Sequence, residues 1–159
     1  MAMTSNFART LARLCGIIVM LSFFGLHSAH ALETKLADPP PSFDEPRKII
    51  LQLTSDDPKK MNDILYNAVN LQKFYGMDNV RIAIIAFGRG MPALYKETSP
   101  VQERIESLMQ YDVQFIGCGN TMDATQHTTA DLIDGVDYVQ AGIAEIVERT
   151  LQGWIYIRP

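Results

Sequence analysis

The sequence predicts an α/β domain with three layers, α/β/α, built on a mainly parallel sheet of four or five strands. Short apolar runs alternate along the chain with amphipathic segments of helical period. In the runs almost every residue is hydrophobic, which is typical of strands covered on both faces, as in parallel sheets. Strands that alternate with helices are joined by right-handed crossovers, so helices are expected on both sides of the sheet.

The first half of the domain contains two predicted strands and the helix between them. Residues 48–53 are the first strand, and the near-continuous apolar run 80–87 is the second. The helix is predicted to begin after Asp57, a typical N-cap before a proline, and to end at Gly76. Its apolar positions repeat with helical period and are Met61, Ile64, Leu65, Ala68, Leu71 and Tyr75.

A loop, a helix and a third strand follow in the same alternation. Residues 88–92 are predicted to be the loop, because they combine two glycines with a proline. A capping-box pattern at 99–102 predicts the start of the next helix. The third strand, 113–118, then leads to Cys118, which stands between two glycines.

The last part of the domain is predicted to hold short helices, one long amphipathic helix and a final strand. One or two short helices are expected within 120–135, where threonine and aspartate offer caps. The amphipathic helix ends at Gly153 and is followed by a strand at 154–157. The apolar positions assigned to that helix are Val139, Ile143, Ile146, Val147 and Leu151.

The N-terminal residues have the composition of a secretory signal peptide. Arg9 and Arg13 form a positive start, residues 14–26 are apolar, and residues 29–31 (Ala-His-Ala) fit a cleavage site. The apolar run is shorter than the roughly 20 residues that span a bilayer. We therefore expect cleavage after Ala31, a periplasmic or secreted protein, and no membrane attachment once the signal is removed.

The domain organisation that follows from this has three parts. Residues 1–31 are the predicted signal peptide, and 47–159 are the predicted folded domain. Between them, residues 32–46 are predicted to be a disordered leader, because they contain four prolines among charged residues.

Cleavage would change the charge and the reactive residues that remain. It would remove two basic residues and no acidic ones, so the formal net charge of −4 would become −6. An acidic domain lacks the clustered Lys and Arg that nucleic-acid binding needs. The mature chain would keep one cysteine, Cys118, and one histidine, His127. An internal disulfide and a structural zinc site, which needs about four ligands, are therefore excluded, and no nicotinamide, flavin or metal cofactor is expected.

Three stretches of the sequence resemble the DsrE/DsrF-like family, and in particular an exported branch of it. They are 117–122 (Gly-Cys-Gly-Asn-Thr-Met), 134–136 (Asp-Gly-Val) and 152–159 (Gln-Gly-Trp-Ile-Tyr-Ile-Arg-Pro). The resemblance extends from Lys48 to the C-terminus. It implies an α/β/α fold, assembly into homo-oligomers and a link to sulfur metabolism.

The resemblance also implies a role for one residue. In cytoplasmic members, including the TusD-like sulfur-relay subunits, a cysteine just past a central strand carries sulfur as a persulfide, and Cys118 is at the matching place. This sequence departs from the cytoplasmic pattern. In that pattern a small-residue helix and an Arg-Gly pair follow the cysteine, whereas here 119–121 (Gly-Asn-Thr) follow it. The predicted signal peptide is a second departure, which separates the chain from the cytoplasmic relay partners.

Cys118 is the first candidate for chemistry on the residues themselves. It follows a predicted central strand, and ligands of open α/β sheets collect at the carboxyl ends of strands. The thiolate is the reactive form of cysteine, and backbone N–H groups at a helix start favour it. Gly117, Gly119 and Asn120 are the adjacent candidates for contact with a ligand, since glycines allow close approach. The alternatives are a thiol packed in the core and a bridge to a second chain.

Two other residues are candidates for the same site. His127 would be a general base for the thiol, in the manner of a Cys–His pair; the alternative is an exposed loop residue or a helix cap. Arg89, in the loop after the neighbouring strand, would bind an anionic sulfur species through its paired guanidinium donors; the alternative is a solvated arginine in an ordinary turn. Met91, Leu94 and Tyr95 would form an apolar lip over the site or a subunit contact.

The leading hypothesis is an exported DsrE-like protein that binds or transfers sulfane sulfur as a persulfide on Cys118. Its partners would be further copies of itself, together with small sulfur species or the thiol of an acceptor protein. The alternative hypothesis is a non-catalytic, oligomeric binding or assembly module in which Cys118 is only packed.

Overall fold

A computed structural model describes residues 32–159, and the predicted signal peptide lies outside them. Residues 32–37 form no helix or strand and belong to a unit separate from the compact domain, 38–159. Within that domain, 38–46 also form no helix or strand, and the sheet begins at Arg47. The predicted disorder of the leader stays a prediction. No helix within 32–159 has the length and apolar composition needed to cross a membrane.

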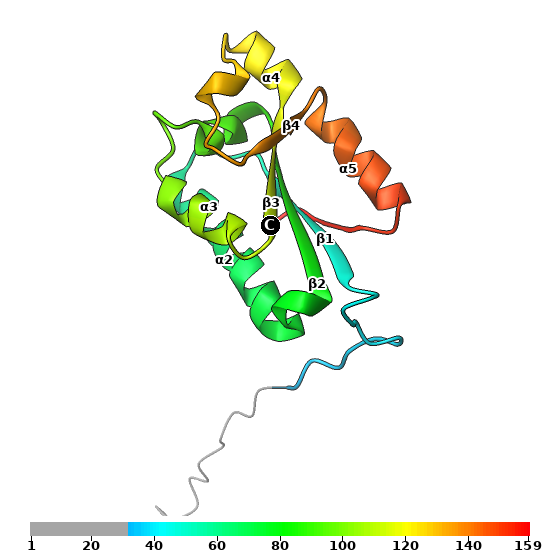
Figure 1. Cartoon of the computed structure of the whole chain (residues 1–159). Coiled ribbons are helices and arrows are strands. Elements are labelled where there is room, and N and C mark those ends of the chain that lie inside the picture. Colours follow the sequence, from blue (N-terminus) through cyan, green and yellow to red (C-terminus); the bar gives the residue numbers. More distant parts are fainter. Residues whose placement is uncertain (1–31) are drawn as a thin grey trace, which may run out of the picture. The chain divides into compact units, whose positions relative to one another are not determined.

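Five parallel strands form a single sheet in the order β4-β3-β2-β1-β5 (Figure 1). The predicted α/β class with a parallel sheet is therefore confirmed. The chain moves one strand at a time from β1 to β4 and then returns to the outer side of β1. The strands are β1 (Arg47–Leu53), β2 (Val80–Ala86), β3 (Val113–Cys118), β4 (Asp137–Val139) and β5 (Ile155–Ile157).

Helices cover both faces of the sheet: α2 and α3 pack on one face and α5 on the other (Figure 1). The α-helices are α2 (Pro58–Tyr75), α3 (Gln102–Met109), α4 (Gly119–Ala124) and α5 (Gly142–Leu151). Three short 3₁₀ helices connect them, namely η1 (Met77–Asn79), η2 (Gly88–Leu94) and η3 (Thr129–Asp131).

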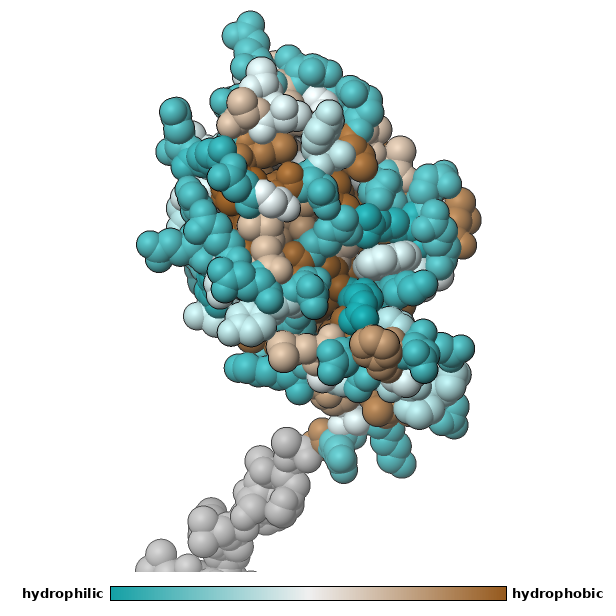
Figure 2. Space-filling model, in the orientation of Figure 1, coloured by the Kyte–Doolittle hydropathy of each residue, from teal (hydrophilic) through white to brown (hydrophobic). Residues whose placement is uncertain are grey.

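The two faces of the sheet carry two hydrophobic cores of different size. Side chains alternate along a strand, so in β1 Ile49 and Leu51 face α2 and α3 while Ile50 faces α5. The core under α5 is the smaller one and contains Ile50, Ala83, Ile85, Ile116 and Ile146. On the side of the protein seen in Figure 2, hydrophilic residues cover most of the surface and hydrophobic ones gather in the middle.

The ends of α2 form as the sequence predicts. The Asp57 side chain accepts a hydrogen bond from the Lys59 backbone N–H at 2.9 Å, and Pro58 occupies the first turn, where no N–H partner is needed. At the other end Gly76 adopts a φ of 84°, a backbone conformation that favours glycine. Both boundaries are thus determined by local residues.

The capping box predicted for α3 is wrong. The helix begins at Gln102 and its N-cap, Val101, makes no side-chain cap bond. Ser99 instead donates its hydroxyl to the Ala93 carbonyl at 2.6 Å and accepts the Val101 N–H. The serine therefore stabilises the end of η2. The helix η2 itself spans 88–94 and includes residues 88–92, for which the sequence predicted a loop.

The predicted start of the last helix is also wrong. Val139 belongs to β4, where it pairs with Cys118 of β3, and α5 begins only at Gly142. Strand β4 has three residues and none of them is fully buried, so it lacks the continuous apolar pattern by which the other strands were found. Its position is determined by pairing with β3 rather than by its own composition.

Candidate functional site

Cys118 lies at the carboxyl end of β3 and forms the N-cap of α4. Cys118 is 6% exposed. The Sγ atom accepts a hydrogen bond from the backbone N–H of Gly142, the first residue of α5, at 3.4 Å, and lies 3.8 Å from the Gln140 carbonyl. On its other side, the Cys118 backbone N–H donates to Sδ of Met91 at 3.3 Å. The sulfur is therefore held where the start of one helix meets the end of a central strand.

Glycine at position 142 is what allows this contact. A Cβ atom there would lie 3.3 Å from the Cβ of Cys118 and 3.4 Å from Cγ2 of Ile85. A side chain at this position would push its neighbours away by a few tenths of an ångström, so glycine favours the close approach of α5 to the sulfur. Gly119 is packed in a similar way, because a Cβ atom on it would lie 3.2 Å from the Cα of Gln140. The junction between β4 and α5 consequently closes over the cysteine.

The surroundings of the thiol act in opposite directions on its ionisation. Burial raises the pKa of Cys118, whereas hydrogen bonds from the Gly142 amide, from the Thr121 hydroxyl and amide, and from the Asn120 amide lower it. The net pKa lies below the ordinary value for cysteine. The Thr121 hydroxyl oxygen accepts the Gly88 N–H at 3.0 Å, so its own proton remains available for the sulfur. The site therefore favours the thiolate, which is the nucleophilic form.

A cavity of about 630 Å³ lies next to Cys118, at the carboxyl ends of the strands. Cys118 itself does not line it, but Met91 and Thr121, both in contact with Cys118, do. Ligands of open α/β sheets bind at this edge. The cavity also contains the predicted site residues Arg89, Asn120 and His127.

Arg89 lies at the rim of the cavity and forms an ion pair with Asp56. Two hydrogen bonds join the side chains, Nη2 to Oδ1 at 2.7 Å and Nε to Oδ2 at 3.1 Å. The hydrogen bond from Arg89 lowers the pKa of Asp56. Both side chains are exposed, at 79% for Arg89 and 47% for Asp56. Exposed ion pairs of this kind contribute little to stability.

His127 lies in the same cavity but makes no hydrogen bond to the sulfur. Its ring stacks on that of Tyr95, with the ring centres 4.0 Å apart and the planes at 3°. Its Nδ1 atom is 3.1 Å from the Thr125 hydroxyl. Tyr95 is buried, and its hydroxyl has no hydrogen-bond partner within the part of the chain that the structure describes. The pair forms one wall of the cavity.

The structure adds two residues that sequence reasoning did not select, Gly142 and Thr121. No pattern in the sequence connects position 142 with Cys118, because the two meet only through the pairing of β3 with β4. Thr121 had a weak signal, since a threonine follows the cysteine within the first turn of a predicted helix. Within 32–159, no three His, Cys, Asp or Glu side chains are grouped so that they could hold a metal ion.

Residues 47–159 match the sequence model of the DsrE/DsrF-like family. The chain belongs to this family. The match begins at the first residue of β1 and covers the whole sheet with its helices. A search of curated proteins gave no match.

Solved structures with the DsrE/DsrF-like fold resemble the domain over most of its length. MTH1491 from Methanobacterium thermoautotrophicum, described as a protein of unknown function, is 31% identical, with a TM-score of 0.68 over 71% of this chain and 99% of its own. The ychN protein from E. coli is 18% identical, with a TM-score of 0.60 over 72% and 99%. BT1422 from Bacteroides thetaiotaomicron is also 18% identical, with a TM-score of 0.56 over 70% and 94%. The last two similarities concern the fold alone.

Proposed function

We propose that this protein is an exported sulfur carrier in which Cys118 binds sulfane sulfur as a persulfide and passes it to an acceptor thiol. The export rests on the signal-peptide composition of residues 1–31, with cleavage after Ala31 and a periplasmic or secreted mature protein. Membership of the DsrE/DsrF-like family supports the connection with sulfur relay.

One observation carries the proposal: the hydrogen bond from the Gly142 N–H to Sγ of Cys118. A backbone amide at the start of a ten-residue helix stabilises negative charge on the sulfur. A cysteine that served only to fill the core would have no need of a donor aimed at its sulfur, because it would remain a neutral thiol.

The proposed transfer balances without an added oxidant. The Cys118 thiolate attacks the outer sulfur of a donor persulfide; the S–S bond of the donor breaks, a new S–S bond forms, and the donor leaves as a thiolate with the bonding electrons. With thiosulfate as donor, sulfite is the leaving group. In the second step an acceptor thiolate attacks the outer sulfur on Cys118, which leaves as a thiolate and is ready for another cycle.

The side chains of the cavity have supporting roles in this proposal. Arg89 would bind the negative charge of the donor in place of Asp56, since a guanidinium presents paired donors to an anion. His127 and Asn120 line the approach and would contact the donor or the leaving group. The donor must reach a sulfur that is largely covered, so its entry involves movement of the residues around Met91 and Thr121.

Intact mass spectrometry of the purified protein after exposure to thiosulfate or polysulfide tests the proposal. We expect a mass gain of one sulfur atom that a reductant removes, and no gain in Cys118→Ser. The same spectrum, recorded for protein collected from the periplasm or the medium, checks whether the chain begins at Leu32. Absence of any adduct with either donor would contradict the carrier function.

A specific observation favours one other function, that of a non-catalytic binding or assembly module. Cys118 is 6% exposed and belongs to the larger hydrophobic core, as a packed cysteine would. Reaction of the native protein with iodoacetamide separates the two functions. Labelling of Cys118 that is fast in the native state supports the carrier, whereas labelling only after denaturation supports the module.

A further inference from the structure

The cavity beside Cys118 has the size and the lining of a site for an organic molecule. Its volume of about 630 Å³ lies within the range of about 300–1,000 Å³ that is usual for small-molecule pockets. Its walls are mainly apolar, and they include Met91, Pro92 and Ala124. Inorganic sulfur anions such as thiosulfate are strongly hydrated, and apolar walls do not replace the water that they would lose. The walls therefore fit a ligand with a carbon body better than an inorganic anion.

The hydroxyl of Tyr95 is a second and independent sign of a ligand. Tyr95 lines the cavity and is 3% exposed, and its hydroxyl has no hydrogen-bond partner among residues 32–159. Burial raises the pKa of Tyr95, and the negative charge of Cys118 adds to this rise, so the hydroxyl lies within electrostatic range of the sulfur. A buried hydroxyl without a partner lowers stability. An acceptor atom on a ligand in this cavity would satisfy it.

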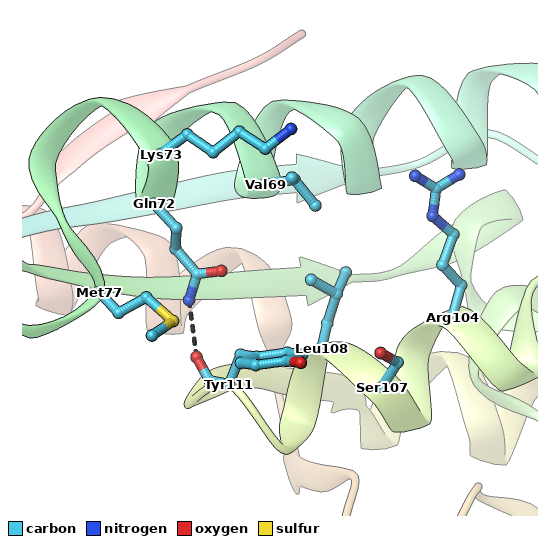
Figure 3. Close-up of a pocket in the computed structure, with 8 residues that line it drawn as sticks. All are labelled: Val69, Gln72, Lys73, Met77, Arg104, Ser107, Leu108 and Tyr111. Atoms are coloured by element: carbon cyan, nitrogen blue, oxygen red, sulfur yellow. Dashed lines mark hydrogen bonds between the residues drawn. The ribbon is translucent and has the colours of Figure 1, made fainter.

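The groove of about 320 Å³ between α2 and α3 lacks this combination of features (Figure 3). Figure 3 shows Val69 and Leu108 reaching toward each other from the two helices. The Gln72 side-chain amide donates a hydrogen bond to the Tyr111 carbonyl at 2.6 Å, so this polar group already has a partner. The groove also lies away from the cysteine, and it does not point to a ligand in the way that the cavity does.

We propose that the cavity binds a small organic persulfide, R–S–SH, as the sulfur donor of Cys118. The carbon group R would lie against the apolar walls at Met91, Pro92 and Ala124, and the sulfur attached to R would lie near the Tyr95 hydroxyl. The inference rests on the proposed carrier function, because Cys118 has to accept the outer sulfur. It adds the class of donor, which is a low-molecular-mass organic persulfide rather than an inorganic anion.

The Tyr95 hydroxyl has a definite task in the transfer step. The Cys118 thiolate attacks the outer sulfur of R–S–SH, the S–S bond of the donor breaks, and a new S–S bond gives the persulfide on Cys118. The donor leaves as the thiolate R–S⁻ with the bonding electrons. This anion forms among apolar walls, where an unpaired charge is unfavourable. A hydrogen bond donated by the Tyr95 hydroxyl would stabilise it.

Two donors that differ only in R test the preference for a carbon body. Benzyl persulfide and methyl persulfide have the same reactive group, and intact mass spectrometry follows the loading of Cys118 by each at low concentration. Each rate is divided by the rate of the same donor with a free thiol in solution, which removes differences in intrinsic reactivity. We expect benzyl persulfide to load Cys118 about tenfold faster, because its ring is buried in the cavity. Equal normalised rates overturn the inference and leave the carrier function in place.

A pair of matched substitutions shows whether the cavity is the source of the preference. Ala124 lines the cavity and Ala130 does not, and both are exposed, so phenylalanine can replace either without entering the core. Ala124→Phe fills the cavity and should abolish the preference for benzyl persulfide, whereas Ala130→Phe should keep it. A preference that survives in Ala124→Phe overturns the inference. Circular dichroism of both variants checks that the domain remains folded.

Binding without transfer separates the failure of this inference from the failure of the carrier function. Calorimetry of Cys118→Ser with benzyl mercaptan should show saturable binding, which the additional substitution Ala124→Phe removes. If no donor loads Cys118, thiosulfate included, the carrier function is contradicted. Binding of benzyl mercaptan would then still support the cavity as a site for an organic ligand, whereas absence of binding overturns the inference as well.

Tyr95→Phe tests the hydrogen bond to the leaving sulfur. The ring and its stack on His127 remain, so only the hydroxyl is lost. Loading from benzyl persulfide should slow about tenfold, the effect of one hydrogen bond to a charged group. Phenyl persulfide should lose less, because its aromatic thiolate is a weaker base and needs less stabilisation. An equal loss with both donors, or no loss with either, overturns the role of the hydroxyl.

Discussion

Two of the hollows in the described domain both have mainly apolar walls, but they differ in where they lie and in which reactive groups stand beside them. The cavity at the carboxyl edge of the sheet lies beside a thiol whose sulfur accepts a backbone N–H, and polar side chains line it. The groove of about 320 Å³ between α2 and α3 is lined by apolar side chains and by Lys73 and Arg104, and it lies away from the cysteine. The difference teaches that position relative to a parallel sheet decides which groups a hollow collects. The strand ends bring a thiol and backbone amides to one point, whereas the groove between two helices on a face of the sheet has no such convergence.

The largest effect is expected from Gly90→Ala, which would destabilise the carboxyl edge of the sheet and leave the groove between α2 and α3 unchanged. A Cβ atom at position 90 would lie 2.0 Å from the Leu53 carbonyl oxygen, a distance that forces the backbone apart. We expect the free energy of unfolding to fall by about 3 kcal/mol, the upper range for overpacking. Urea denaturation measures this free energy of unfolding.

Gly88→Ala is the matched control for that change. Gly88 has a φ of 54° but open space around its Cα, so alanine there costs only the strain of the left-handed conformation, about 1 kcal/mol. Equal losses for the two variants would show that backbone conformation, and not the contact with Leu53, determines the fold of this edge.

The next effect concerns the reactivity of Cys118. Thr121→Val removes a hydroxyl that lowers the pKa of the thiol, so the pKa should rise and the thiolate fraction at neutral pH should fall. Alkylation at pH 7 is expected to slow about threefold to tenfold, since one pKa unit is a factor of ten. The pH dependence of the iodoacetamide rate measures this.

Thr121→Ser keeps the hydroxyl and serves as control. Its rate profile should stay close to that of the wild type. If the valine variant also leaves the profile unchanged, the hydroxyl does not act on the sulfur, and only the backbone amides of Gly142, Thr121 and Asn120 favour the thiolate.

A smaller effect is expected from Tyr95→Phe. The Tyr95 hydroxyl is buried without a hydrogen-bond partner among the described residues, and burial raises its pKa. Phenylalanine keeps the stack on His127 and removes only the unsatisfied group. The free energy of unfolding should therefore rise by about 1 kcal/mol. A loss of stability in urea denaturation would mean that the hydroxyl has a partner, for which Thr125 is the nearest candidate in its surroundings.

The smallest effect is expected from Asp56→Asn, which breaks the exposed pair with Arg89. The hydrogen bond from Arg89 lowers the pKa of Asp56 in the folded protein below its ordinary value of 3.8. The contribution of the pair is therefore complete above that value and is lost as the pH falls below it. Thermal unfolding at pH 7 should change little, and the variant should be less sensitive to acid than the wild type. A large loss at pH 7 would show that the pair supports the fold.

The parallel α/β fold could be predicted because three strands have almost continuous apolar runs. The strand order could not, since it depends on β4 and β5, which have three residues each and are mostly exposed. The sequence predicted the apolar positions of the last helix but not which of them face the sheet. Ile143, Val147 and Leu151 repeat with helical period, yet they are exposed in the domain.

Much of the candidate site also follows from the sequence. Arg89 and Asn120 come after strands whose carboxyl ends meet, and both line one cavity. His127 lines it too, although its distance from Cys118 along the sequence did not show whether it would reach the site. The direct surroundings of the sulfur did not follow. Gly142 reaches Cys118 because β4 pairs with β3 and turns the chain back across the strand end. A contact of this kind belongs to the topology, and no local spacing of residues encodes it.

The return of β5 to the outer side of β1 has a consequence for how the chain folds during its synthesis. Ile49 pairs with Ile155, so the partner of the outer edge of β1 is synthesised about a hundred residues later. Pairing of β1 with β5 therefore closes a long loop. Until then the nascent chain carries an unpaired apolar strand edge, which attracts other chains. A holding chaperone that covers β1 would therefore protect this protein most before β5 arrives.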